Sequence, residues 1–203
     1  MNQLVESEVK LAVEDLDPII AKLDAAGAEL VQERVYENNF RYENAGETLT
    51  ANGIVLRLRQ DSRVRLTYKA PASDDLDLAD GVLTRFEAEV TVDDFDVMDL
   101  ILQRLGFHPY VVYEKYRTTY HLGEAEIVLD EMPYGNFVEI EGPTSAIRAA
   151  LKTLELHNEP RLLTNYMALF DRVKAALNLD VHDLTFANFQ NVEVPLEVFT
   201  SGE

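Results

Sequence analysis

The sequence contains no cysteine, and it has few cations. With no thiol among its 203 residues, the chain has no disulfide framework, no thiolate metal ligand and no cysteine nucleophile. Eighteen Lys and Arg residues stand against 37 Asp and Glu residues, which gives a formal net charge of −19. Such a surface repels nucleic acid and anionic lipid. An anion can still bind, but only where the few cations are gathered.

Long apolar runs and targeting signals are also missing. No apolar stretch approaches the length of about 18 residues that a membrane-spanning helix needs. The segment from Met1 to Glu6 has neither the basic region nor the apolar stretch of a signal peptide. We therefore expect a soluble, cytoplasmic protein that binds neither nucleic acid nor membrane. Its 47% apolar content is enough to bury one sizeable core.

Two hydrophobic periods divide the chain into strands and helices. Alternation with period two predicts strands over residues 4–13, 31–42, 53–60, 64–70, 83–92, 110–122, 124–131 and 136–141. Helical spacing predicts helices from Asp17, as N-cap, to Gly27, from Asp93 or Asp94 to Gly106, and, behind Thr caps, over 144–156 and 164–177. The second of these helices carries an apolar side made of Val97, Leu100, Ile101 and Leu105.

About eight strands, mostly in hairpin order with helices between them, predict an α+β fold built on an antiparallel sheet or a closed barrel. A weak internal repeat supports a symmetric arrangement. The strings Glu6–Val9 and Glu87–Val90 are each followed by a capped helix, a glycine and a strand that carries tyrosine. The two halves of the sheet are therefore expected to be related by a pseudo-twofold axis.

One face of nearly every predicted strand is charged. Side chains two residues apart on a strand point the same way, about 6.6 Å from one another. Eight of the eighteen basic residues lie on these faces, namely Lys10, Arg57, Arg59, Arg65, Lys69, Arg85, Lys115 and Arg117. The acidic residues on them are Glu6, Glu8, Glu87, Glu89, Glu126, Asp130, Glu139 and Glu141.

These faces have two interpretations. In the first, they are the solvated side of an open sheet. In the second, they line a polar interior that holds a polyanion. The near absence of neutral polar residues in these positions favours this second interpretation. A triphosphate spreads about four negative charges along a line, which suits Lys and Arg from several strands. Carboxylates beside them select Mg²⁺ or Mn²⁺, which bridge to phosphate oxygens.

The string Glu6-x-Glu8-x-Lys10 resembles the E-x-E-x-K signature of the CYTH family, also called triphosphate tunnel metalloenzymes. That family includes class IV adenylyl cyclases, thiamine triphosphatases and inorganic tripolyphosphatases. Further family motifs follow in order as Arg57-x-Arg59, Lys69, Glu87-x-Glu89, Lys115-x-Arg117, Asp130 and residues 135–141. The resemblance implies an eight-stranded antiparallel β-barrel, or tunnel, with flanking helices and with the triphosphate at its centre.

The resemblance also implies roles for individual residues. The implied phosphate ligands are Lys10, Arg57, Arg59, Lys69, Lys115 and Arg117, to which strand alternation alone adds Arg65 and Arg85. The implied ligands of one or two Mg²⁺ or Mn²⁺ ions are Glu6, Glu8, Asp130, Glu139 and Glu141. Glu87 and Glu89 either hold the second ion or orient the arginines. The candidate catalytic residues are Lys10, Glu6 and Glu8.

Three functions fit this pattern. The leading hypothesis is a metal-dependent hydrolase of inorganic or organic triphosphates, such as tripolyphosphate, ATP or thiamine triphosphate. The second is an adenylyl cyclase that converts ATP to cyclic AMP and pyrophosphate, and the third is a non-catalytic polyphosphate or nucleotide sensor. The many carboxylates argue against the sensor. We expect a tunnel domain over 1–178 and a tail over 179–203 that packs on the barrel or its mouth, and a homodimer is compatible with the family.

Overall fold

The computed structural model describes residues 5–71 and 83–200. The described chain has eight strands: β1 (Val5–Val13), β2 (Glu29–Asn44), β3 (Val55–Gln60), β4 (Val64–Pro71), β5 (Leu83–Val92), β6 (Phe107–Leu122), β7 (Ala125–Met132) and β8 (Gly135–Glu141). Its helices are α1 (Asp17–Ala25), α2 (Thr48–Ala51), α3 (Phe95–Arg104), α4 (Thr144–Thr153), α5 (Tyr166–Leu177) and α6 (Glu197–Thr200).

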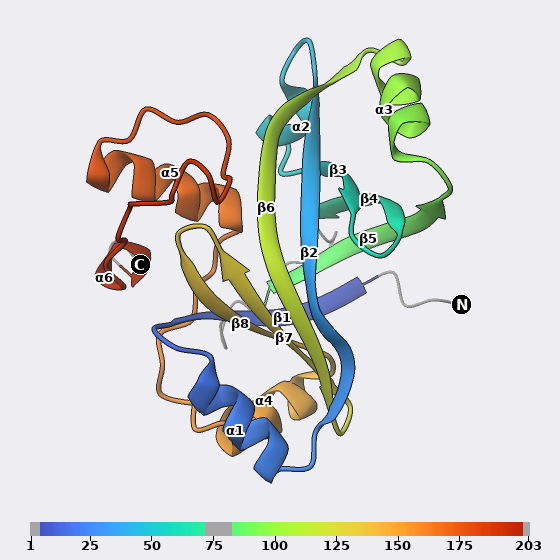
Figure 1. Ribbon diagram of the computed structural model, residues 1–203. Coiled ribbons are helices and arrows are strands. Elements are labelled where there is room, and N and C mark those ends of the chain that lie inside the picture. Colours follow the sequence, from blue (N-terminus) through green and yellow to red (C-terminus); the bar gives the residue numbers. More distant parts are fainter. Residues whose placement is uncertain (1–4, 72–82, 201–203) are drawn as a thin grey trace.

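The strands form a closed antiparallel barrel in the order β1-β5-β4-β3-β2-β6-β7-β8. The ring closes because β1 pairs with β5 on one side and with β8 on the other. Strands β2 and β6, of 16 residues each, run side by side along the whole molecule (Figure 1). The predicted eight-stranded antiparallel barrel with flanking helices is therefore confirmed.

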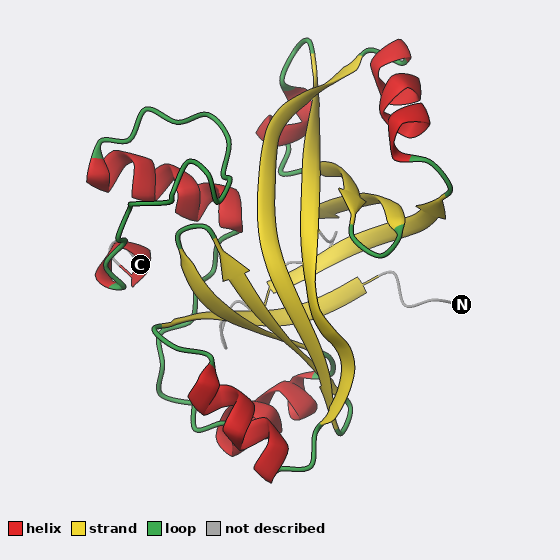
Figure 2. Ribbon diagram, viewed as in Figure 1, coloured by secondary structure: helices red, strands yellow, loops and turns green. Residues whose placement is uncertain are grey.

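Helices lie on the outside of the barrel (Figure 2), where they cover apolar faces of several strands. Helices α1 and α4 bury one apolar cluster against β1, β7 and β8, with Leu11, Ile127 and Ile140 at its centre. Helix α3 covers Leu58 and Tyr42. Because these faces are packed against helices, the alternate side chains of the same strands point into the barrel.

The second predicted helix packs with a different face from the one expected. Helix α3 turns Leu102 and its neighbours Phe95 and Met98 toward the barrel. The expected apolar side is exposed, with 44% to 69% of each side chain in contact with solvent, for Val97, Leu100, Ile101 and Leu105. Sequence spacing finds the helix, but two apolar stripes on one helix leave its packed face undetermined.

Three of the predicted helix starts need correction, and one is confirmed. Asp94 caps α3 by accepting a hydrogen bond from the N–H of Val97 at 2.9 Å. Helix α1 starts after Leu16, with Asp17 already in its first turn. Helix α4 follows Pro143 without a side-chain cap, and the cap of α5 is Asn165 instead of Thr164. The short helices α2 and α6 were not predicted at all.

The segment after α5 packs on the rest of the chain. Leu184, Phe189 and Phe199 are buried beside α5 and the β7–β8 hairpin, where they contact Tyr134 and Phe137 among others. Leu184 also exchanges backbone hydrogen bonds with β6 on the edge that β7 leaves uncovered. The domain boundary at residue 178 stays a prediction. No helix in the described part of the chain is long and apolar enough to cross a lipid bilayer.

Candidate active site

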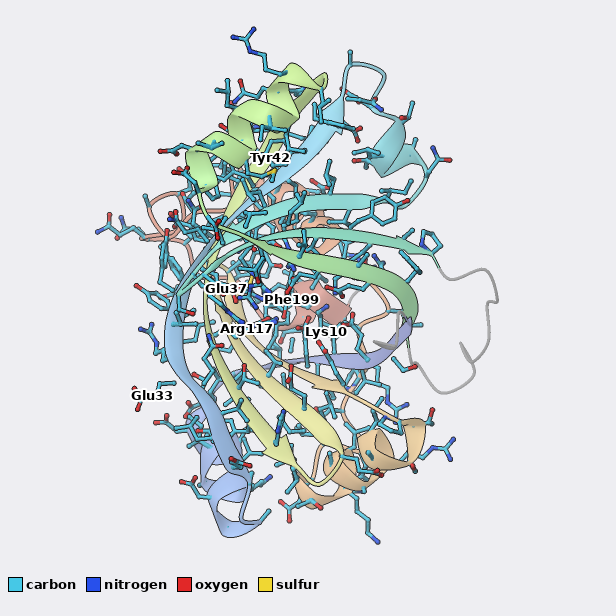
Figure 3. The ribbon with its side chains drawn as sticks, turned by 90° about the vertical axis from the view of Figure 1, so that its right-hand side faces the viewer. Lys10, Glu33, Glu37, Tyr42, Arg117 and Phe199 are labelled. Carbon is cyan, nitrogen blue, oxygen red and sulfur yellow. The ribbon has the colours of Figure 1, made fainter. Side chains whose placement is uncertain are left out.

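The barrel encloses a cavity of about 390 Å³ whose lining is mostly charged. In Figure 3, Lys10, Glu37 and Arg117 lie in the middle of the barrel, whereas Glu33 lies at its outer edge. Ten of the chain's 18 Lys and Arg residues line the cavity, namely Lys10, Arg41, Arg57, Arg59, Arg63, Arg65, Lys69, Arg85, Lys115 and Arg117. The few cations of this acidic protein are therefore gathered in one place.

The two signs of charge are concentrated on opposite sides of the barrel. Strands β3 and β4 stand across the ring from β8 and β7. The charged lining residues of the first pair and its connecting turn are all cations, namely Arg57, Arg59, Arg63, Arg65 and Lys69. The second pair contributes carboxylates only, namely Glu126, Glu139 and Glu141, to which the adjacent β1 adds Glu8. We call these the arginine wall and the glutamate wall.

The arginine wall is held in place by a carboxylate on β5. Glu89 lies 3.3 Å from Arg59, 3.7 Å from Arg65 and 3.8 Å from Arg57, and it accepts a hydrogen bond from the hydroxyl of Thr67 at 2.7 Å. The Nε–H groups of these three arginines are buried and, within the described residues, have no hydrogen-bond acceptor. Since buried donors are normally paired, the wall has spare donors for an anion.

Asp130 organises the cations at the other end of the cavity. It is fully buried and accepts hydrogen bonds from Lys115 Nζ at 3.0 Å and from Arg117 at 2.7 Å and 2.6 Å. Arg117 also reaches Glu139 at 2.7 Å, and Glu139 pairs with Lys10 at 2.8 Å. Burial opposes the charge on Glu139, but Lys10 and Arg117 outweigh it and hold its pKa well below the usual range. The Glu139 carboxyl is thus held in its ionised form between these two cations.

Glu37 on β2 is a site residue that sequence reasoning missed. Its side chain is 1% exposed and lies 3.3 Å from Arg59 and 3.5 Å from Lys115. Burial raises the pKa of its carboxyl, but Lys115, Arg117 and Arg59 together bring that pKa far below its ordinary value. The available signal was the alternation of Glu37, Asn39 and Arg41, which share one face of the predicted strand.

The glutamate wall brings like charges together. Glu8 and Glu141 face each other across β1 and β8, and Glu126 faces Glu141 from β7. Burial and the nearby carboxylates of Glu139 and Glu8 raise the pKa of Glu141 to about 7. The Nζ of Lys10 lies 4.0 Å from Glu8, but it pairs more closely with Glu139, at 2.8 Å. The positive charge beside the glutamate wall is therefore too small to neutralise its carboxylates.

This pKa shift predicts a specific pH dependence of stability. A carboxyl whose folded-state pKa exceeds its unfolded value of about 4.3 stabilises the fold in its neutral form. That stability is present below about pH 4 and is lost as the pH rises through about 7. We expect the Tm to fall by about 5 °C more in the wild type than in Glu141→Gln between pH 5 and pH 8. Calorimetry measures this, and equal falls in the two proteins would contradict the shift.

The structure brings nearly all of the predicted site residues together. Thirteen of them line the cavity: Glu8, Lys10, Arg57, Arg59, Arg65, Lys69, Arg85, Glu87, Glu89, Lys115, Arg117, Glu139 and Glu141. The side chain of Glu6 lies outside the described residues. Asp130 lies behind the lining, with its oxygens already bonded to four donors.

Two tyrosines and an asparagine also line the cavity without having been predicted, as do Arg41 and Arg63. Tyr113 accepts a hydrogen bond from Arg57 at 3.3 Å, and Tyr166 follows Asn165 at the start of α5. Tyr113 lies on the charged face of β6, two residues before Lys115, and is also buried in the apolar cluster that includes residues of α5.

Comparison with known proteins places the chain among proteins of the same architecture. A candidate adenylate cyclase from Methanocaldococcus jannaschii is 27% identical over 154 residues, which are 75% of this chain and 85% of that protein. The structure of a candidate adenylate cyclase from Vibrio parahaemolyticus matches with a TM-score of 0.71 at 19% identity, covering 84% of this chain and 99% of that one. A candidate adenylyl cyclase from Hippeastrum, described as having a dominant triphosphatase activity, matches with a TM-score of 0.60 at 19% identity, covering 82% and 95%. The CYTH domain model matches residues 4–168, and the chain belongs to the CYTH domain family.

Proposed function

We propose that this protein is a metal-dependent hydrolase of triphosphates that binds its substrate inside the barrel. The observation that carries the proposal is the gathering of ten of 18 cations around one cavity in a chain of net charge −19. A protein concentrates cations against its overall charge where a compact polyanion must be neutralised. Inorganic tripolyphosphate is the smallest substrate with that chemistry.

The arginine wall binds the phosphates in this proposal. Guanidinium groups present fixed, planar donors to phosphate oxygens, and the Nε–H groups of Arg57, Arg59 and Arg65, which have no hydrogen-bond acceptor among the described residues, supply such donors. Glu89 contacts all three arginines, which supports a role in orienting them. Glu87 pairs with Lys69 and has the same role.

The glutamate wall suits a divalent cation that arrives with the substrate. In the described part of the chain, no three acidic or histidine side chains are already arranged as a complete set of metal ligands. Mg²⁺ and Mn²⁺ commonly take one or two carboxylates and complete their coordination with water and substrate phosphates. Glu8 and Glu141 provide such a pair, and the crowding that raises the pKa of Glu141 is what a cation would relieve. A divalent ion held there would neutralise phosphate charge and lower the pKa of bound water.

The chain's own residues then stabilise the charge that develops during hydrolysis. Phosphoryl transfer depends mainly on alignment and charge neutralisation. Lys10, Lys115 and Arg117 are fixed by Glu139 and Asp130 before substrate arrives, so they stabilise the developing charge without reorganising. Asp130 acts in this scheme by orienting cations, since its four bonded donors leave it little capacity as a metal ligand.

Adenylyl cyclase activity is the second candidate, favoured by the relative from Methanocaldococcus jannaschii. The fold does not separate the two activities, because the Hippeastrum protein is described both as a candidate cyclase and as a triphosphatase. The cavity lining favours the hydrolase. The aromatic residues of the lining, among the described residues, are Tyr113 and Tyr166. Lys10 lies over the ring of Tyr166, and Tyr113 is 6% exposed, so little aromatic surface is left for stacking with adenine.

A product assay tests the proposal. Purified protein is incubated with tripolyphosphate or ATP, each with Mg²⁺, with Mn²⁺ or with a chelator, and the products are identified. We expect orthophosphate and pyrophosphate from tripolyphosphate, dependent on metal. Cyclic AMP with pyrophosphate from ATP would assign the cyclase activity instead. Tight binding without any product would identify a sensor.

A further inference from the structure

The first turn of α5 enters the cavity that the barrel strands form. Tyr166 donates a hydrogen bond from its hydroxyl to Asp130 Oδ2 at 2.8 Å, and the Nζ of Lys10 lies 4.3 Å from the centre of its ring. Phe137 packs edge-on against the same ring at 5.2 Å. A residue from outside the barrel thus contacts two of the groups that organise the site.

This end of α5 is firmly attached. Just upstream, the N–H of Leu162 bonds to the carbonyl of Lys10 at 2.8 Å, and the hydroxyl of Tyr134 bonds to the carbonyl of Tyr166 at 2.9 Å. The Asn165 side chain accepts the N–H groups of the next helical residues. Because those amides are already bonded, the helix end has few donors left for an anion. The contacts of this helix end with Asp130 and Lys10 are made by the Tyr166 side chain.

Asp130 is the group through which that influence passes. Its Oδ2 accepts from Tyr166, from Lys115 at 3.0 Å and from Arg117 at 2.6 Å. Donors that share one carboxylate oxygen compete for its charge. A phenol donor therefore weakens the hold of Asp130 on the two cations and leaves them more available to a phosphate.

We propose that Tyr166 is a positioning residue for the triphosphate: its hydroxyl sets how tightly Asp130 holds Lys115 and Arg117, and its ring face holds Lys10 toward the cavity. The inference rests on the proposed function and extends it by making α5, which is outside the barrel, part of the binding machinery. Burial and the nearby charges of Asp130 and Glu139 raise the pKa of Tyr166 well above its ordinary value, so the hydroxyl remains a donor.

Two substitutions separate the hydroxyl from the ring. Tyr166→Phe removes only the hydrogen bond to Asp130, and Tyr166→Leu also removes the ring beside Lys10. We expect tripolyphosphate to bind about tenfold more weakly to Tyr166→Phe, and about a further tenfold more weakly to Tyr166→Leu. Titration calorimetry without metal measures binding independently of turnover. An affinity of Tyr166→Phe that lies between those of the wild type and Tyr166→Leu shows that the contact between the ring and Lys10 contributes to binding.

The chain offers a matched control in Tyr42→Phe. The hydroxyl of Tyr42 also donates to a carboxylate, that of Asp99 at 2.7 Å, but it lies under α3 and away from the cavity. Both Phe variants should lose similar amounts of Tm, whereas only Tyr166→Phe should lose tripolyphosphate affinity. Unchanged affinity in Tyr166→Phe, or equal losses in the two Phe variants, would overturn the inference and leave the proposed function intact. A wild type that binds no tripolyphosphate would overturn both.

Discussion

Replacing Glu8 with glutamine is expected to lower kcat for tripolyphosphate by about 10³-fold. Glu8 faces Glu141 across two strands of the glutamate wall, and its side chain is 17% exposed, so it can reach a ligand in the cavity. A bound divalent ion contributes several kcal/mol to transition-state stabilisation. A loss of about 4 kcal/mol of transition-state stabilisation corresponds to the expected 10³-fold fall in kcat. Steady-state kinetics with varied Mg²⁺ or Mn²⁺ measure both the rate and the metal requirement.

Binding without metal distinguishes this role from simple damage to the cavity. Glu8→Gln removes one negative charge from the lining, so tripolyphosphate should bind at least as tightly as to the wild type in the presence of a chelator. Glu14→Gln, at an exposed position just beyond the end of the same strand, is the control and should retain wild-type kinetics. Normal turnover by Glu8→Gln would refute the assignment of the glutamate wall to a metal ion.

The barrel and most of its lining could be predicted because a strand has a strict period. Wherever Arg, Lys, Glu and Asp alternate with aliphatic residues, the side chains separate onto two faces, and burying the aliphatic face under helices directs the other face inward. Lys10 between Val9 and Leu11 is an example, with all three side chains at most 4% exposed. The order of the charged positions along the chain then matched the motifs of the CYTH family, which implied that the inward face binds a triphosphate.

The rest depends on contacts between segments far apart in the sequence. Tyr166 lies at a helix start, where nothing local indicates that its hydroxyl reaches Asp130 on β7. The face of α3 that packs was undetermined, because both of its apolar stripes satisfy helical spacing. Helix α2 has only four residues, too few to show a period, and it is stabilised locally by the carboxylate of Glu43, which accepts hydrogen bonds from the N–H groups of Leu49 and Thr50. Neither kind of contact leaves a periodic signal in the sequence.

Glu37 has the largest expected effect on stability, and its replacement should separate stability from binding. The carboxylate of Glu37 is buried between Arg59 and Lys115, with Arg57 and Arg117 also close enough to lower its pKa. Removing one partner from a buried charge cluster leaves the others uncompensated and costs about 3 kcal/mol or more. Glu37→Gln should therefore lower the Tm of the free protein by about 10 °C.

The same substitution should tighten the binding of tripolyphosphate by about 30-fold. A unit charge about 8 Å away is worth about 2 kcal/mol at an effective dielectric constant of 20, and Glu37→Gln removes a negative charge from beside the cations that meet the phosphates. The rise in Tm on addition of tripolyphosphate should consequently be larger for Glu37→Gln than for the wild type. Glu33→Gln, at an exposed position on the same strand, should change neither quantity. If Glu37→Gln lost both stability and affinity, the carboxylate would be needed to hold Arg59 and Lys115 in their binding positions, and the expected gain in affinity from removing its charge would be refuted.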